Sequence, residues 1–165
     1  MSQSNERPPH SAASPDPSHP AVGDDHGRPL TTNATAAAWY RAAQGSVVNG
    51  DGPDPALRRA LQADPTFAVA ACDLLALTDD LPPSEPARPS TSWERHHCEI
   101  VSEAHRDVGR ASGILREHLA DVGCDPLAVH IVCEALRTAG HNGDRFAEVA
   151  DLLASTVDCH PLTAQ

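Results

Sequence analysis

Apolar residues recur at intervals of three and four along most of the chain after residue 33, which is the period of an α-helix. Glycine, asparagine, aspartate and proline interrupt this pattern, as they do at helix ends and turns. The pattern predicts about seven helices, each of roughly 11 to 15 residues. Their expected spans are 34–48, 55–63, 66–78, 93–106, 110–122, 127–139 and 144–157. No segment alternates with a period of two, so we expect no sheet.

Two segments lack the helical pattern. Residues 1–33 are rich in proline, serine and histidine and hold almost no aliphatic side chains, so they cannot bury enough apolar area to offset the entropy of ordering. Between 81 and 92, four prolines exclude a helix. We therefore expect a disordered tail at 1–33 and one helical domain at 34–165, interrupted by a Pro-rich connector at 81–92.

The spacing of residues 57–65 predicts how the helices pack. Leu57 is apolar, Ala60 is small, and Pro65 follows five positions later, as in the second helix of a tetratricopeptide unit. Such units stack as antiparallel helix pairs. The predicted fold is therefore all-α, a short right-handed stack of tetratricopeptide-like pairs, with a closed bundle as the alternative. Asp54 is expected to cap this helix and Pro55 to occupy its first position.

Charge and composition narrow the range of partners. The net charge is −11, from 12 arginines and 23 acidic residues with no lysine. Such a surface repels nucleic acid and anionic membranes and favours a basic protein or peptide. The chain begins without a signal sequence, and no run approaches the roughly 18 to 20 apolar residues of a membrane span. Five cysteines without regular spacing favour reduced thiols in the cytoplasm.

Acidic side chains are the predicted partner-binding residues. If the helices stack in pairs, these residues collect near the centre of the array, where they form a face that suits a cationic peptide. The alternative is a charged surface that only maintains solubility. The residues are Asp73, Asp79, Asp80, Glu85, Glu94, Glu99 and Glu103.

Histidine and cysteine form the weak candidates for a metal site. Glu94-x-x-His97 has the spacing of a di-iron ligand pair, but the sequence holds no second Glu-x-x-His. His97 also lies on an apolar stripe, which favours a hydrogen-bonded core histidine. His130-x-x-Cys133 offers two zinc ligands or, as the preferred interpretation, part of a solvated helix face. We therefore predict no metal and no cofactor, and the weak candidates are His97, Cys98, His105, His130 and Cys133.

Nucleophilic catalysis has little support in the sequence. Cys98 follows His97 directly, and neighbours on a helix point about 100° apart, so they do not form a thiolate and base pair. The chain has no nucleophile elbow, phosphate-binding loop or dinucleotide fingerprint. We therefore expect a protein that is not an enzyme.

Three segments carry a resemblance to a known family. They are 56–68, with its Asp64-Pro65, then 93–99, which begins Trp93-Glu94-Arg95, and 111–120, which ends in an Arg-Glu-His-Leu-Ala run. In this order they resemble the N-terminal part of the tetratricopeptide repeat protein 38-like family, over about residues 35–155. The resemblance implies helix pairs that serve display and assembly. The Pro-rich connector replaces one helix of the regular array. Because the family continues beyond this length, we expect either a shortened relative or a chain that assembles with a partner.

The sequence therefore predicts a cytoplasmic, non-enzymatic scaffold that binds a peptide or partner protein. Self-association through the C-terminal helix is a further expectation. Two alternatives are a small metal-dependent enzyme or sensor that uses the histidine and cysteine candidates, and a remnant without retained activity.

Overall fold

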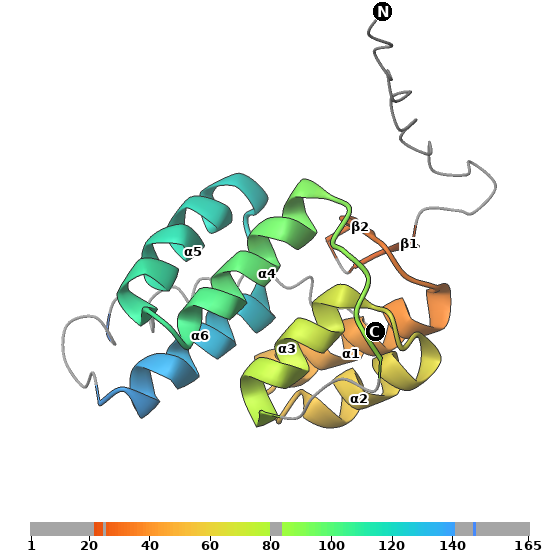
Figure 1. Ribbon diagram of the computed structural model, residues 1–165, viewed down its shortest axis with the longest axis horizontal. Coiled ribbons are helices and arrows are strands. Elements are labelled where there is room, and N and C mark those ends of the chain that lie inside the picture. The colour runs from red at the N-terminus through yellow and green to blue at the C-terminus, as the bar shows by residue number, and fades with distance from the viewer. Residues whose placement is uncertain (1–21, 25, 80–83, 141–146, 148–165) are drawn as a thin grey trace, which may run out of the picture.

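The computed structural model describes residues 22–24, 26–79, 84–140 and 147. Within them the chain forms six helices and one short hairpin, so the all-α prediction is confirmed (Figure 1). The helices are α1 (Ala34–Val48), α2 (Asp54–Ala63), α3 (Ala68–Thr78), α4 (Ser92–Ala104), α5 (Val108–Val122) and α6 (Pro126–Thr138). The predicted seventh helix, at 144–157, falls outside the described residues except for Ala147.

Side chains before most of the helices fix where they begin. Asn33, Asp107 and Asp125 each accept a hydrogen bond from a free backbone N–H in the first turn of the helix that follows. Thr91 and Glu94 form a reciprocal capping box at the start of α4. The predicted Asp54 cap is wrong, because Pro53 holds the cap position of α2 and Asp54 lies inside the first turn.

Part of the predicted tail is ordered. Strands β1 (Val22–Gly23) and β2 (Pro29–Leu30) pair antiparallel, so the expectations of disorder up to residue 33 and of no sheet are wrong here. The turn depends on polar contacts rather than on an apolar pattern. The carboxylate of Asp24 accepts hydrogen bonds from the backbone N–H groups of His26 and Arg28 at 3.0 and 2.9 Å. Leu30 then packs into the core.

Two groups of helices surround two apolar clusters. Figure 1 shows α1, α2 and α3 at one end of the molecule and α4, α5 and α6 at the other. The first cluster contains Leu57, Ala60 and Phe67, and the second contains Ile100, Leu115 and Ile131. Leu57 and Ala60, the signature residues of the repeat, are fully buried. Together the two groups make one continuous helical domain over the described part of the chain.

Helix α6 closes the described array. It contacts α1, α3, α4 and α5, and Leu127 at its start belongs to the first cluster while the rest of its apolar residues belong to the second. Because the ends of an open stack do not meet, the contact between α1 and α6 resembles the closed alternative. Helix α6 therefore joins the first group of helices to the second.

The connector is not helical where the structure describes it. Residues 84–91 run from the region after α3 to the start of α4, and Ala87 N–H donates to the Thr66 carbonyl at 2.8 Å. Residues 80–83 lie outside the described part of the chain. With no helix inserted over 84–91, α3 and α4 pack directly against each other.

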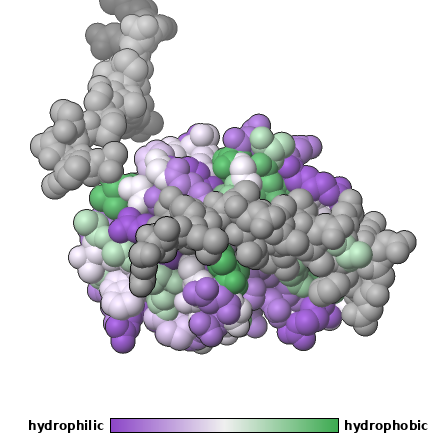
Figure 2. Space-filling view, turned by 180° about the vertical axis from the view of Figure 1, so that it is seen from behind, coloured by the Kyte–Doolittle hydropathy of each residue, from purple (hydrophilic) through white to green (hydrophobic). Residues whose placement is uncertain are grey.

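The described surface carries little large apolar area. Leu75, 40% exposed, is the one large hydrophobic residue that is exposed within the described ranges. Figure 2 shows hydrophilic residues over much of the visible face, with apolar residues in scattered patches. None of the helices that the structure describes is long and apolar enough to cross a membrane.

Candidate functional site

Four titratable side chains form a chain of hydrogen bonds inside the protein. We call Asp73, His97, His118 and Asp125 the buried histidine network. His97 Nε2 lies 2.7 Å from Asp73 Oδ1, and His97 Nδ1 lies 2.7 Å from Asp125 Oδ2. His118 Nε2 lies 2.9 Å from the same Asp125 oxygen. Because both ring nitrogens of His97 face carboxylates, both donate, and the ring is an imidazolium.

The carboxylates control the charge on His97. Burial opposes that charge, but Asp125 and Asp73 together raise the pKa of His97 well above its usual value. Burial also opposes the charge on Asp125, yet His97 and His118 hold the pKa of Asp125 well below the usual range. Asp73 is different, because burial is the dominant cause and raises its pKa. The strongest ion pair of the network is therefore His97 with Asp125.

The network links four helices rather than forming an accessible site. Asp73 lies on α3, His97 on α4, His118 on α5, and Asp125 caps the start of α6. All four side chains are at most 2% exposed. His97 is thus the hydrogen-bonded core histidine that its apolar stripe predicted. The network therefore holds these helices in position relative to one another.

Sequence reasoning missed half of the network. Asp125 precedes Pro126 at a predicted helix start, and a cap was the only role that such a position suggests. His118 lies on the predicted apolar stripe of its helix, three residues after the buried Leu115. A polar ring on an apolar stripe requires a buried partner, and this was the signal that could have found it.

The predicted acidic face does not form as a unit. Asp73 is inside the network, and Glu94 is 1% exposed. Glu94 accepts a hydrogen bond from Thr31 N–H at 2.7 Å in addition to its capping contacts, so it joins β2 to α4. These two residues are therefore not available to a partner. Asp79, Glu85 and Glu99 are exposed, Glu103 is half-buried, and Asp80 lies outside the described residues.

The metal candidates are dispersed. His97 lies in the network, Cys98 packs near Cys72, and His105 and His130 line a surface groove. Burial raises the pKa of Cys133 to about 12, which keeps this thiol protonated at neutral pH in the metal-free protein. In the part of the chain that the structure describes, no three side chains of histidine, cysteine, aspartate or glutamate are placed to hold a metal ion.

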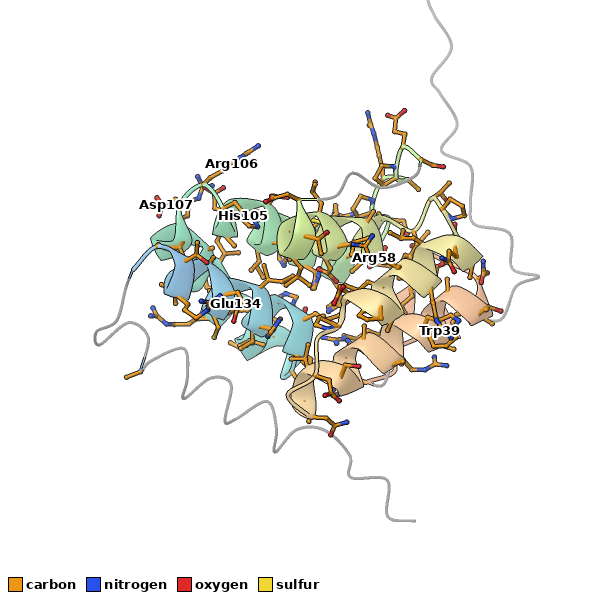
Figure 3. The ribbon with its side chains drawn as sticks, turned by 90° about the horizontal axis from the view of Figure 1, so that it is seen from below. Trp39, Arg58, His105, Arg106, Asp107 and Glu134 are labelled. Carbon is orange, nitrogen blue, oxygen red and sulfur yellow. The ribbon has the colours of Figure 1, made fainter. Side chains whose placement is uncertain are left out.

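A groove of about 640 Å³ opens along one side of α6, and we call it the α6 groove. Four parts of the chain line it: the turn before α2, the C-terminal end of α3, the turn between α4 and α5, and α6 itself. Leu77, Ile131 and Ala135 supply apolar surface. In Figure 3, His105, Arg106 and Glu134 lie at the same end of the molecule, while Trp39 and Arg58 lie at the other.

Charges are divided among the walls of the α6 groove. Asp54 and Asp79 line the wall formed by α2 and α3. On α6 the Arg137 guanidinium lies 2.6 Å from a Glu134 carboxylate oxygen, so that wall is close to neutral. Burial lowers the pKa of His130, which keeps this half-buried imidazole uncharged at neutral pH. Arg106, in the turn between α4 and α5, also lines the groove. The groove therefore offers an apolar surface with an acidic wall on α2 and α3 and a basic side chain on the α4–α5 turn.

The two sites differ in what they can bind. The side chains of the buried histidine network hydrogen-bond to one another inside the protein, although Asp73 Oδ2 and His118 Nδ1 have no partner among the described residues. The α6 groove instead presents apolar and charged groups at the surface. Apolar surface with a few polar groups is what a peptide side chain requires. No protein-family model, curated protein or solved structure matches the chain in the comparisons made.

Proposed function

We propose that this chain is a non-enzymatic helical interaction module of the cytoplasm, and that its α6 groove binds a basic, amphipathic peptide segment of a partner protein. The apolar side of the peptide packs on Leu77, Ile131 and Ala135, and a lysine or arginine of the peptide pairs with Asp79. This keeps the tetratricopeptide repeat protein 38-like relationship as part of the proposal, which the buried Leu57 and Ala60 of α2 support.

The position of Asp79 at the end of α3 is the observation that supports the proposal most directly. Asp79 ends α3 in the left-handed region, with φ 57°, and its side chain is exposed on the groove wall. A carboxylate is unfavourable at a helix C-terminus, where the helix dipole is negative, and glycine or asparagine suits the left-handed conformation better. A residue that costs stability where a better one exists often has a functional role.

The charge of the whole molecule supports a basic partner. A net charge of −11 attracts cationic segments and repels anionic ones before any contact forms. Asp54 adds a second carboxylate to the same wall as Asp79. The carboxylates of the groove therefore select peptides by the sign of their charge, and its apolar surface selects peptides with an apolar stripe.

The experiment uses the full chain and a panel of labelled twelve-residue peptides, each with an apolar stripe and either lysine or glutamate on the polar side. Binding is measured by fluorescence anisotropy at low salt. We expect lysine peptides to bind, glutamate peptides not to bind, and Asp79→Asn to weaken binding by about tenfold, the effect of losing one partly buried charge contact.

Asp121→Asn is the matched control. Asp121 is exposed in the last turn of α5 and lies outside the α6 groove, so this change removes a carboxylate from near another helix C-terminus. The variant should bind lysine peptides as the wild type does. Equal binding of both peptide types, or equal loss in both variants, would contradict the proposal.

A further inference from the structure

Two cysteines meet where α3 packs against α4. Cys72 Sγ lies 3.7 Å from the Cys98 carbonyl oxygen and 3.8 Å from Ser102 Oγ, so the Cys72 side chain reaches across to α4. The two thiols are close enough for each to shift the pKa of the other. They are 26 positions apart in the sequence, and the Pro-rich connector lies between them.

Both thiols keep some contact with solvent. Cys72 and Cys98 are half-buried, whereas Cys124 and Cys133 are buried. Ser102, next to Cys72 on the other helix, is exposed. A small reagent can therefore reach the α3–α4 junction without unfolding of the helices, which is the condition for a reactive cysteine.

The pair is chemically asymmetric. The neighbouring Cys98 thiol lowers the pKa of Cys72, although burial and the nearby Asp73 act in the opposite direction. The same contact, together with burial, raises the pKa of Cys98. Cys72 is thus the more acidic thiol of the pair, which suits an attacking cysteine, and Cys98 suits the role of a resolving cysteine.

We propose that Cys72 and Cys98 are a redox-active dithiol that a hydroperoxide oxidises to an intramolecular disulfide between α3 and α4. The Cys72 thiolate attacks the terminal peroxide oxygen, the O–O bond breaks, and the leaving alkoxide or hydroxide takes a proton. Cys72 becomes a sulfenic acid. The Cys98 sulfur then attacks the Cys72 sulfur, the S–S bond forms, and the sulfenic oxygen leaves as water with the proton of Cys98.

The balance of this reaction is two thiols and one hydroperoxide to one disulfide, one water and one alcohol, or a second water when the oxidant is hydrogen peroxide. Two electrons pass from the thiols to the peroxide. The bridge forms beside the buried histidine network, because Asp73 follows Cys72 and His97 precedes Cys98. Oxidation therefore fixes the two helices that hold the Asp73–His97 hydrogen bond.

The test treats the full chain with hydrogen peroxide and follows intact mass and peptide maps under non-reducing conditions. We expect loss of two hydrogens, a cross-linked peptide containing Cys72 and Cys98, and reversal by dithiothreitol. Closure of a loop of this length raises the melting temperature of the oxidised form by roughly 10 °C.

Three variants assign the roles. Cys98→Ser should accumulate a sulfenic acid at Cys72 that dimedone traps, and Cys72→Ser should form neither product. Cys133→Ser is the matched control and should cross-link as the wild type does. Circular dichroism confirms that each variant is folded before oxidation. A peroxide-treated wild type without the Cys72–Cys98 peptide, or dimedone labelling of Cys98 in place of Cys72, would overturn the proposal.

Faster alkylation gives an independent measurement that needs no variant. In the native wild type, iodoacetamide should label Cys72 at least about tenfold faster than Cys133, because thiolate content sets the rate. Equal labelling rates at the two positions would also count against the proposal.

Discussion

Asp73 and Asp79 lie six residues apart around α3, and the fold gives them opposite environments. Asp73 is fully buried and hydrogen-bonded to His97, whereas Asp79 is exposed on the wall of the α6 groove. Burial makes the first carboxylate dependent on a partner inside the protein, and exposure leaves the second open to a partner outside it. The same side chain thus supports the fold at one position and, in our proposal, recognition at the other.

The most direct way to break this comparison is to remove the partner inside. His97→Ala leaves two buried carboxylates without their shared donor, and we expect the free energy of unfolding to fall by about 3–5 kcal/mol. Urea denaturation followed by circular dichroism measures it. His105→Ala is the control, because His105 is exposed and surface changes stay within about 0.5 kcal/mol. Similar losses in both variants would show that the network does not hold the core.

The dependence of stability on pH tests the charges of the network. His97 has a raised pKa in the folded protein, so its contribution is complete below about pH 6.5, the pKa of an unfolded histidine, and is lost as the pH rises through the folded pKa. The lowered pKa of Asp125 contributes above about pH 3.9 and is lost as the pH falls. Asp73, with a raised pKa, partly offsets the acid limb.

We therefore expect stability to peak in the weakly acidic to neutral range and to decline on both sides. Urea midpoints across the pH range measure this, and His97→Gln should flatten the alkaline limb. An alkaline limb that is unchanged in His97→Gln would assign it to other groups.

A smaller effect is expected where a carboxylate joins two segments at the edge of the core. Glu94→Ala removes the capping contact of α4 and the hydrogen bonds to Thr31, and we expect a loss of about 1–3 kcal/mol. Thermal unfolding compares it with Glu99→Ala, which removes an exposed carboxylate from the same helix. Glu99→Ala should change stability by less than about 0.5 kcal/mol. If Glu94→Ala also lowers the free energy of unfolding by less than about 0.5 kcal/mol, Glu94 has no structural role.

The smallest effect is expected at Asp79, and its sign is opposite. Asp79→Asn removes a negative charge from a helix C-terminus, so stability should rise by about 0.3–1 kcal/mol. Asp121→Asn should give a gain of similar size on α5. Thermal unfolding at low salt measures both. A stability loss in Asp79→Asn would show that this carboxylate supports the fold, and the comparison with Asp73 would then fail.

The sequence predicted the helices well because the information for each helix is local. Apolar spacing located α1 to α6. The predicted starts of α5 and α6, at 110 and 127, lie two residues and one residue after the observed ones, where Asp107 and Asp125 cap the helices. The hairpin at 22–30 was missed, because it depends on the turn contacts of Asp24 rather than on an apolar pattern. The cap on α2 was misassigned by one residue, since both Asp54 and a proline stand at that boundary.

The sequence by itself determined an all-helical chain with a break at the Pro-rich connector, because helix period and proline geometry act over a few residues. Only the tertiary structure decided which charged residues lie inside. The sequence predicted the same role for Asp73, Glu94 and Asp79. The packing of α3 against α4 and α6 buries Asp73, the segment after β2 covers Glu94, and Asp79 stays exposed. Burial and hydrogen-bond partners are properties of helices brought together, so the pattern along one helix does not contain them.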